Sequence, residues 1–194
     1  MKTQALPSLL LALLATTTAA GCAAVATGAL ITTVVVTQDR RSMGTVIDDS
    51  VVEIRIRERL DQAGIDNETN QVYITSVNGV VLLTGQVRNR RLHDRVLAAT
   101  RSVPQVRQVI NELRVGPPPD ARSNARDTWL AGKVKTRLIK ASGPALATRI
   151  NVHVNNGVVY LMGLVTRAEG DRAAGAVRTL RGVKRVVKVF EYVG

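Results

Sequence analysis

The feature that most constrains this chain is an internal repeat. Residues 156–163 (NGVVYLMG) are a near copy of residues 78–85 (NGVVLLTG), at an offset of 78 residues, and both glycines of the segment are retained. A repeat is resolved before any other pattern because it fixes how many structural units the chain contains. Here it divides 194 residues into two units of one design. Each unit spans roughly 70 residues, enough for a modest hydrophobic core.

The first unit opens with the pattern of an amphipathic helix. Ser50 and Glu53 have the spacing of a capping box, which predicts that a helix starts at this point. Val52, Ile56 and Leu60 recur every four residues and therefore share one face of that helix. We expect this face to pack on the core.

A β-hairpin is predicted next. Residues 72–77 alternate in the manner of a strand and are rich in β-branched side chains. Asn78 and Gly79 are the pair favoured in a two-residue turn with positive φ at both centres, and residues 80–86 form the return strand. Gly85, near the end of that strand, indicates a bulge or a close approach of another backbone. A second helix and a third strand complete the unit, and we expect them at residues 89–102 and 106–115.

The second unit repeats this plan, and its third strand carries a one-residue slip. Its first predicted helix is capped by Asp127 and Thr128 and carries the apolar stripe Leu130, Val134 and Leu138. Two strands are predicted at 150–155 and 158–165 about the turn residues Asn156 and Gly157, with Gly163 in the position of Gly85. A second helix is predicted from the capping box of Thr166 and Glu169 to Gly182, followed by a strand at 183–193.

Between the units, residues 116–120 contain three consecutive prolines, which can continue neither a helix nor a central strand. The fold class predicted is α+β, with two tandem domains of the order αββαβ, each placing two helices on a three-stranded mixed sheet. The predicted divisions are a signal peptide at 1–21, an acylated cysteine and tether at 22–45, the first domain at 46–115, a Pro-rich linker at 116–124 and the second domain at 125–194.

The N-terminal segment has the order of a secretory signal. Lys2 precedes an apolar stretch at residues 9–14, and small residues at 19–21 stand directly before Cys22, the only cysteine. That arrangement favours a lipoprotein signal in which Cys22 becomes the first mature residue and carries the acyl chains, although Ala19 stands where this pattern usually has Leu. Two alternatives stay open: an uncleaved membrane anchor, since about 20 apolar residues suffice, or a simple signal peptide. All three export the repeats.

The charge of the chain indicates an anionic partner. There are 27 Lys and Arg against 15 Asp and Glu, a formal net charge of +12, for which nucleic acid and a membrane surface are the usual partners. Aromatic residues make up 3% of the chain, too few for a base-stacking surface. Together with export, this disfavours nucleic acid.

No residue pattern predicts an enzyme, a metal site or a cofactor. His93 and His153 are not at equivalent positions of the repeat and have no partner at ligand spacing, so they are expected to be ordinary surface or strand residues. Asp48, Asp49 and Asp127 stand at predicted helix starts, where capping explains an acid. We find no motif of a nucleophile elbow, a zinc protease or a phosphate-binding loop.

The first helix of the second unit carries the only tryptophan. Trp129 could be a core residue, the default for a large apolar side chain. Its spacing argues otherwise, because it lies in register with Lys133 and Arg137 and away from the apolar stripe of Leu130 and Val134. A tryptophan among basic residues suits a membrane interface, where the indole sits at the level of the headgroups. In the first unit the equivalent stripe begins with Val51 instead.

These residues resemble a known family. The chain resembles proteins with two BON domains that are lipoproteins of the Gram-negative outer membrane. The segments that carry the resemblance are the two hairpins with their glycines, residues 41–45, Asp127 with Trp129, and residues 182–186. The resemblance implies a protein that faces the periplasm, binds anionic phospholipid of the phosphatidylglycerol type through the first helix of its second domain, collects at the division site and supports envelope integrity. The membrane-contact residues that it implies are Trp129, Leu130, Lys133, Val134 and Arg137. This chain departs from the family at Arg137 and Lys140, where short polar residues are usual, and we include Lys140 in the predicted site because a further cation favours attraction to anionic lipid.

A second hypothesis is a protein-interaction adaptor for outer-membrane assembly or cell-wall remodelling factors. Two further basic clusters stand at Arg88, Arg90, Arg91 and Arg95 in the first unit and at Lys184, Arg185 and Lys188 in the second. A solvated face is the simpler explanation of the first cluster, and contact with lipid, peptidoglycan or a protein partner is the alternative. The same holds for the second cluster, where lysines at a sheet edge equally suit protection against pairing with another sheet. The oligomeric state stays open.

Overall fold

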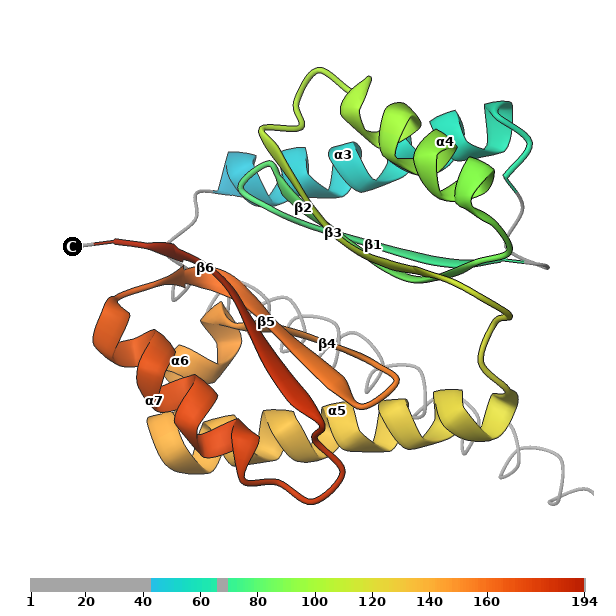
Figure 1. Cartoon of the computed structure of the whole chain (residues 1–194). Coiled ribbons are helices and arrows are strands. Elements are labelled where there is room, and N and C mark those ends of the chain that lie inside the picture. The colour runs from blue at the N-terminus through green and yellow to red at the C-terminus, as the bar shows by residue number, and fades with distance from the viewer. Residues whose placement is uncertain (1–42, 66–69, 194) are drawn as a thin grey trace, which may run out of the picture. The chain divides into compact units, whose positions relative to one another are not determined.

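The computed structural model describes residues 43–65 and 70–193, apart from the side chains of Met43 and Ile47 (Figure 1). The predicted signal peptide and Cys22 lie outside the described residues. Residues 40–194 form one compact unit. Within the described ranges, no helix is long and apolar enough to span a membrane.

This unit contains two domains with the predicted order of elements, and domain 2 has one additional short helix. Domain 1 consists of α3 (Met43–Gln62), β1 (Gln71–Val77), β2 (Val80–Val87), α4 (Arg90–Arg101) and β3 (Gln108–Val115). Domain 2 consists of α5 (Ala121–Ser142), α6 (Pro144–Arg149), β4 (Asn151–Asn155), β5 (Val158–Val165), α7 (Arg167–Arg178) and β6 (Arg185–Tyr192). The short helix α6 was not predicted. It begins at a proline, which suits a first helical turn, and buries Leu146 in the core of domain 2.

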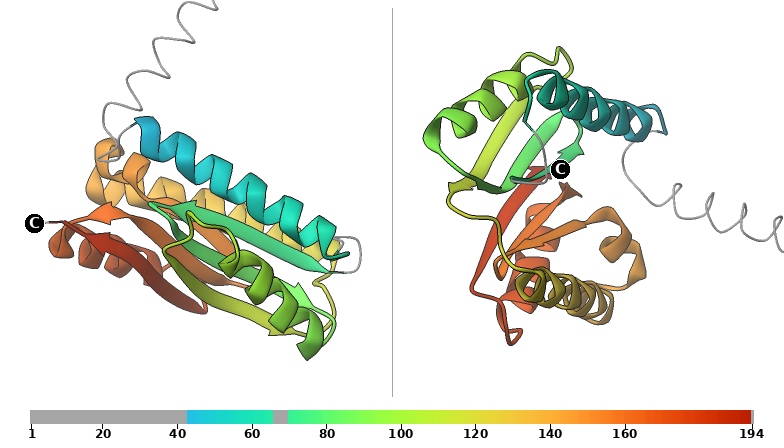
Figure 2. Two further views of the ribbon diagram at one scale, coloured as in Figure 1. Left: turned by 90° about the horizontal axis from the view of Figure 1, so that it is seen from above. Right: turned by 90° about the vertical axis from the view of Figure 1, so that its right-hand side faces the viewer.

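Each domain contains one three-stranded mixed sheet, as predicted. The first two strands form an antiparallel hairpin and the third pairs in parallel with the second, giving the orders β1-β2-β3 and β4-β5-β6. In each domain the helices cover one face of the sheet (Figures 1 and 2). The predicted stripes are confirmed: Val52, Ile56 and Leu60 are buried in domain 1, and the stripe of α5 is buried in domain 2.

The other faces of the two sheets meet in a third apolar cluster. It joins Val77 and Leu82 of domain 1 to Val158, Tyr160 and Met162 of domain 2. The central strands β2 and β5 are therefore buried on both faces for nearly their whole length.

Polar contacts frame this apolar cluster. Arg185 donates from its guanidinium to the Glu112 carboxylate at 2.6 Å, and the Tyr160 hydroxyl donates to the same carboxylate at 3.3 Å. Asn78 donates its side-chain amide to Glu191 at 2.7 Å. These polar contacts thus join the two domains through side chains of β3, β5, β6 and the first hairpin.

The two Asn-Gly hairpins have the predicted turn geometry. Asn78 and Gly79 have φ of 53° and 73°, and Asn156 and Gly157 have φ of 52° and 76°. Gly85 and Gly163 are places of close backbone approach, also as predicted. A Cβ on Gly85 would overlap the carbonyl oxygen of Gln71, and one on Gly163 would overlap that of Arg149.

The predicted capping roles of Ser50, Asp49 and Asp127 are wrong. Helix α3 begins at Met43, so Ser50 lies inside it and donates its hydroxyl to the Val46 carbonyl. Asp49 instead accepts hydrogen bonds from the backbone amides of Asn78 and Gly79, at 2.7 and 2.9 Å.

Asp127 does the same in domain 2. Helix α5 begins at Ala121, inside the stretch predicted as linker, and Asp120 caps it by accepting from the Ser123 amide. Asp127 accepts from the amides of Asn156 and Gly157 at 2.6 and 2.9 Å. In both domains a helical aspartate therefore fixes the hairpin to the first helix.

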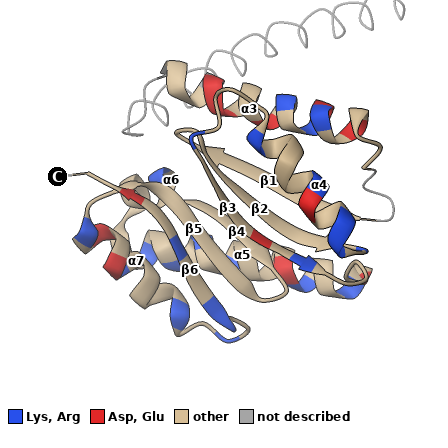
Figure 3. Cartoon of the chain, turned by 45° about the horizontal axis from the view of Figure 1, so that its top comes forward, with Lys and Arg blue, Asp and Glu red and all other residues tan. Residues whose placement is uncertain are grey.

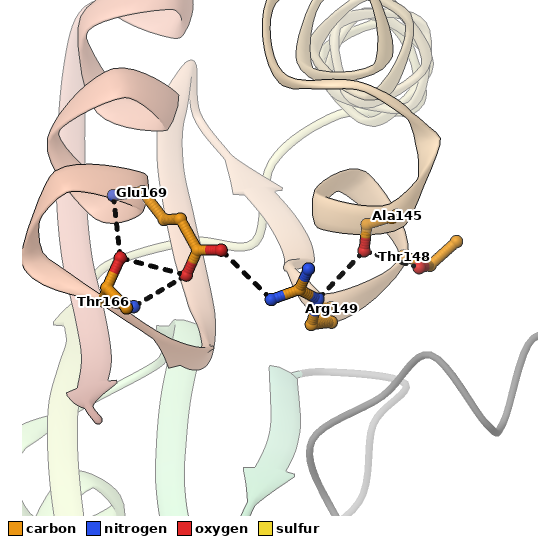
Figure 4. Close-up of polar contacts among 5 residues, drawn as sticks. All are labelled: Ala145, Thr148, Arg149, Thr166 and Glu169. Atoms are coloured by element: carbon orange, nitrogen blue, oxygen red, sulfur yellow. Dashed lines mark hydrogen bonds and ion pairs between the residues drawn. The ribbon is translucent and has the colours of Figure 1, made fainter. Parts of the chain in front are cut away.

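The start of α7 confirms one capping prediction, and its end corrects another. The Thr166 hydroxyl accepts from the Glu169 amide, and the Glu169 carboxylate accepts from the Thr166 amide. The same carboxylate accepts from Arg149 at 3.1 Å, which ties the end of α6 to the start of α7 (Figure 4). The helix ends at Arg178 with Thr179 as its C-cap, not at Gly182, which lies in the following loop with φ of 103°.

Candidate functional site

Helix α5 divides its sequence into a buried stripe and an exposed basic face. Leu130, Val134 and Leu138 are 4%, 0% and 0% exposed, respectively. Of the residues predicted to contact lipid, Val134 is therefore in the core and does not reach the surface. Leu130 is also a core residue, and it reaches only the floor of a surface hollow.

Trp129 stands on the opposite, exposed side of α5. Its side chain is 64% exposed, the highest value among the exposed large hydrophobic residues of the described chain. The ammonium group of Lys133 lies 4.3 Å from the ring centroid, one helical turn further on. This distance is that of a cation–π contact, which holds the amine beside the indole. The structure thus rules out the core interpretation of Trp129.

Two surface hollows meet at Trp129. The α7-side hollow, of about 540 Å³, lies between α5 and the end of α7; it is lined by Trp129, Gly132, Lys133, Thr136, Arg137, Lys140 and Leu180. Three of the predicted lipid-contact residues (Lys133, Arg137 and Lys140) therefore come together around one depression beside the indole.

Two of these cations are also held by backbone carbonyls. Arg137 donates from Nε to the Ala176 carbonyl at 3.3 Å, and Lys133 donates from Nζ to the Arg181 carbonyl at 3.4 Å. Both carbonyls belong to the C-terminal end of α7 or the loop after it, where a helix carries partial negative charge. These hydrogen bonds orient the side chains of Lys133 and Arg137 but leave their positive charges unneutralised, because a carbonyl carries no net charge.

The hairpin-side hollow, of about 450 Å³, lies on the other side of Trp129. Its walls come from the N-terminal half of α5, the second hairpin and the loop between α7 and β6; its lining residues are Ser123, Arg126, Asp127, Trp129, Leu130, Asn156, Gly157, Arg181, Gly182 and Lys184. Arg126 and Arg181 were not predicted as site residues, and Lys184 was considered only as part of a separate basic cluster near the last strand.

The charge along α5 has one sign on its exposed side. The helix contains six basic residues and a single acid, Asp127, which is 8% exposed and turned toward the hairpin. Blue segments recur along α5 in Figure 3. The equivalent helix α3 has five acidic residues and three basic ones, with Val51 in the position of Trp129 and Asp48 in that of Arg126. The exposed cationic face with an aromatic side chain is thus specific to domain 2.

Residues of the other basic clusters have partners within the chain. Arg90 pairs with Asp94 at 3.3 Å, and Arg95 donates to the Ala63 carbonyl. Lys188 pairs with Asp171 at 3.0 Å. With the bond from Arg185 to Glu112, these contacts give part of each cluster a structural role.

The prediction that the histidines are ordinary surface or strand residues is wrong for His93, which is buried on α4, and is confirmed for His153, which lies on strand β4. His93 is 7% exposed and lies between Asp94 and Asn111, with both ring nitrogens in hydrogen bonds at 2.9 Å. His153 lies on the face of β4 toward domain 1, where its Nε2 is 2.7 Å from the Thr84 hydroxyl. Burial lowers the pKa of His153 below the usual value. No group of three or more His, Cys, Asp or Glu in the described ranges could hold a metal ion.

The family assignment agrees with this architecture. Residues 48–117 and 126–194 each match the BON domain, and the two matches account for the two αββαβ units. The chain therefore belongs to the BON-domain family, as a protein with two such domains.

Two curated proteins are similar to this chain over about four fifths of its length. The chain is 36% identical over 157 residues to the Outer membrane lipoprotein DolP of Haemophilus influenzae, a match that covers 81% of each chain. It is 32% identical over 155 residues to the 21 kDa hemolysin of Actinobacillus pleuropneumoniae, covering 80% of this chain and 79% of that one. The C-terminal domain of CdsD, a structural protein of the type III secretion system of Chlamydia trachomatis, aligns with 72% of this chain and 96% of its own, at 12% identity and a TM-score of 0.31.

Proposed function

We propose that this protein is an outer-membrane lipoprotein, anchored through Cys22 and facing the periplasm, whose domain 2 binds anionic phospholipid through α5. The single observation that carries the lipid-binding part is the exposed Trp129 with the Lys133 amine over its ring, on a helix face that also presents Arg137 and Lys140. The similarity to DolP, together with the order of residues around Cys22, supports the anchor and the location.

The physical argument rests on how each group behaves at a membrane surface. An indole favours the interface because its ring is apolar and its N–H can still be hydrogen-bonded. Each Lys or Arg near an anionic leaflet contributes about 1 kcal/mol. The Trp129 face therefore supplies a few kcal/mol, which gives weak and reversible binding. Under this proposal the acyl anchor retains the protein and α5 selects anionic lipid.

Domain 1 is expected to contribute little to lipid binding. Its equivalent face carries Val51, Arg55 and Arg59, but Glu58 stands between the two arginines in the same depression. An acid at that place repels an anionic surface and offsets one of the bases.

Binding of the 40–194 chain to vesicles tests the proposal. These residues form one compact unit with their own hydrophobic cores, so they are expected to fold without the N-terminal segment. Vesicles of phosphatidylcholine with phosphatidylglycerol should bind the protein and change the emission of its one tryptophan, and added salt should weaken binding.

The variant Trp129→Glu should lose this binding, measured by co-sedimentation because the variant has no tryptophan. The matched control is Ile54→Glu, which places the same charge on an exposed apolar position of α3, where the native side chain is 52% exposed. Equal binding by both variants and the wild type would remove α5 from the mechanism.

We further propose that lipid binding directs the protein to the division site and supports envelope integrity. The adaptor hypothesis gives a different outcome in cells. If Trp129→Glu loses vesicle binding but still restores the envelope of a strain that lacks the protein, then protein partners rather than lipid carry that function.

A further inference from the structure

We infer that the hairpin-side hollow holds the phosphate of one anionic glycerophospholipid headgroup, so that the loop between α7 and β6 is a second lipid-contact element. This inference rests on the proposed function and adds Arg181 and Lys184 to the binding site. Helix α5 then forms one wall of the lipid-binding site, and the second hairpin and the loop between α7 and β6 form the others.

The hollow combines the two properties that a lipid headgroup requires. Its floor is the buried Leu130 and one wall is the exposed indole of Trp129, which together offer an apolar surface to the glycerol and the first acyl carbons. Arg126, Arg181 and Lys184 supply positive charge at its edge. A volume of about 450 Å³ lies within the range of small-molecule pockets.

Among the described residues Arg181 and Lys184 have no ion-pair partner, and Arg126 has a coulombic interaction with the exposed Asp120 but no salt bridge. Their neighbours on the same domain are paired: Arg185 with Glu112 and Lys188 with Asp171. The remaining acid of the lining, Asp127, directs both carboxylate oxygens at the amides of Asn156 and Gly157. The positive charge at the edge is therefore available to an external anion.

The position of Lys184 is fixed by the hairpin. Its amide donates to the Gly157 carbonyl at 2.9 Å, and its side chain crosses the face of Gly157, where an added Cβ would lie 3.3 Å from Cδ and Cε. Asp127 holds the hairpin from the other side. The loop is thus positioned before any ligand binds, which lowers the entropic cost of binding.

Domain 1 provides an internal comparison. The Arg107 amide donates to the Gly79 carbonyl at 2.9 Å, so Arg107 is the structural equivalent of Lys184. Its guanidinium, however, donates to the Asn78 carbonyl at 2.9 Å and lies 3.7 Å from the Glu191 carboxylate. Pro104 takes the place of Arg181, and Asp48 that of Arg126. The same fold therefore forms a cationic hollow only where these side chains differ.

The test compares two double variants of the 40–194 chain. Arg181→Gln with Lys184→Gln removes two charges from the loop, and Arg91→Gln with Arg101→Gln removes two exposed charges from α4 of domain 1. Trp129 emission reports binding to phosphatidylcholine vesicles with phosphatidylglycerol. Two basic contacts at about fivefold each predict roughly 25-fold weaker binding for the loop variant, and less than threefold weaker binding for the control.

The outcomes are distinguishable. If the loop variant binds as the control does while Trp129→Glu does not bind, the inference is overturned and the proposed function stands. If the wild type ignores these vesicles, the proposed function fails and this inference with it.

A third arm uses glycerophosphoglycerol, the same headgroup without acyl chains. Weak competition with vesicles is the expected result, because the apolar floor has nothing to bury. Binding as tight as that of vesicles would overturn the lipid assignment in favour of a soluble phosphate ester.

Discussion

Truncation of the Asp127 side chain should lower the stability of domain 2 by more than the loss of one small side chain would suggest. Its buried carboxylate accepts the amides of Asn156 and Gly157 across 29 and 30 residues of sequence. In Asp127→Ala the buried Gly157 amide is left without its acceptor, at a cost of about 1–3 kcal/mol, while the less buried Asn156 amide can recruit water. We expect the free energy of unfolding to fall by about 2 kcal/mol, the middle of this range. Asp127→Asn keeps one acceptor oxygen and should lose about half as much.

Urea unfolding of the 40–194 chain measures this effect. Trp129 emission follows domain 2, and far-ultraviolet circular dichroism follows both domains. Asp171→Asn is the control, because it removes an exposed acid paired with Lys188, and exposed ion pairs contribute at most about 1 kcal/mol. A loss below about 1 kcal/mol in Asp127→Ala would refute the conclusion that this carboxylate holds the hairpin.

Two further stability predictions follow from single positions. Gly163→Ala should destabilise domain 2 in thermal unfolding because its Cβ would overlap the Arg149 carbonyl oxygen, whereas Gly175→Ala on α7 has open space and should stabilise it by about 0.5–1 kcal/mol; equal melting temperatures would contradict this. Burial, followed by the charge of Glu112, raises the pKa of Tyr160 to about 12. The folded state therefore favours the neutral phenol of Tyr160. This preference contributes to the free energy of unfolding in full below about pH 10, and the contribution is lost as the pH rises toward 12. Glu112→Gln should lower the midpoint of the Tyr160 ionisation, measured by ultraviolet absorbance. An unchanged midpoint would exclude the carboxylate as a cause.

Local patterns in the sequence predict the elements of this fold well. The Asn-Gly turns, the apolar stripes and the close approach at Gly85 and Gly163 each depend on residues near in sequence or on backbone geometry that only glycine adopts. Because the chain contains two copies of each element, the residues at equivalent positions of both copies predict the same structure.

The roles of Asp49 and Asp127 could not be predicted in this way. Each lies about one helical turn or more inside its helix and bonds a hairpin some 30 residues away, so no local rule identifies it. One signal was present: the two aspartates recur at the offset of 78 residues, as the hairpins do.

The burial of β5 on both faces of its sheet was also indicated in the sequence. Residues 158–162 are a continuous apolar run, which is typical of a strand covered on both sides, whereas a one-sided sheet alternates. The partner of the second face cannot be inferred from such a run, because it depends on how the two domains pack. The same limit applies to Arg181 and Lys184, which tertiary structure alone brings to Trp129.

The most direct measurement of the central claim is a map of backbone amide shifts of the 40–194 chain on addition of phosphatidylglycerol micelles. Shifts are predicted to concentrate on residues 126–140 and 181–184, with α3 and α4 of domain 1 unaffected. Shifts centred on domain 1, or spread evenly over basic residues of both domains, would contradict recognition of anionic lipid by the Trp129 face.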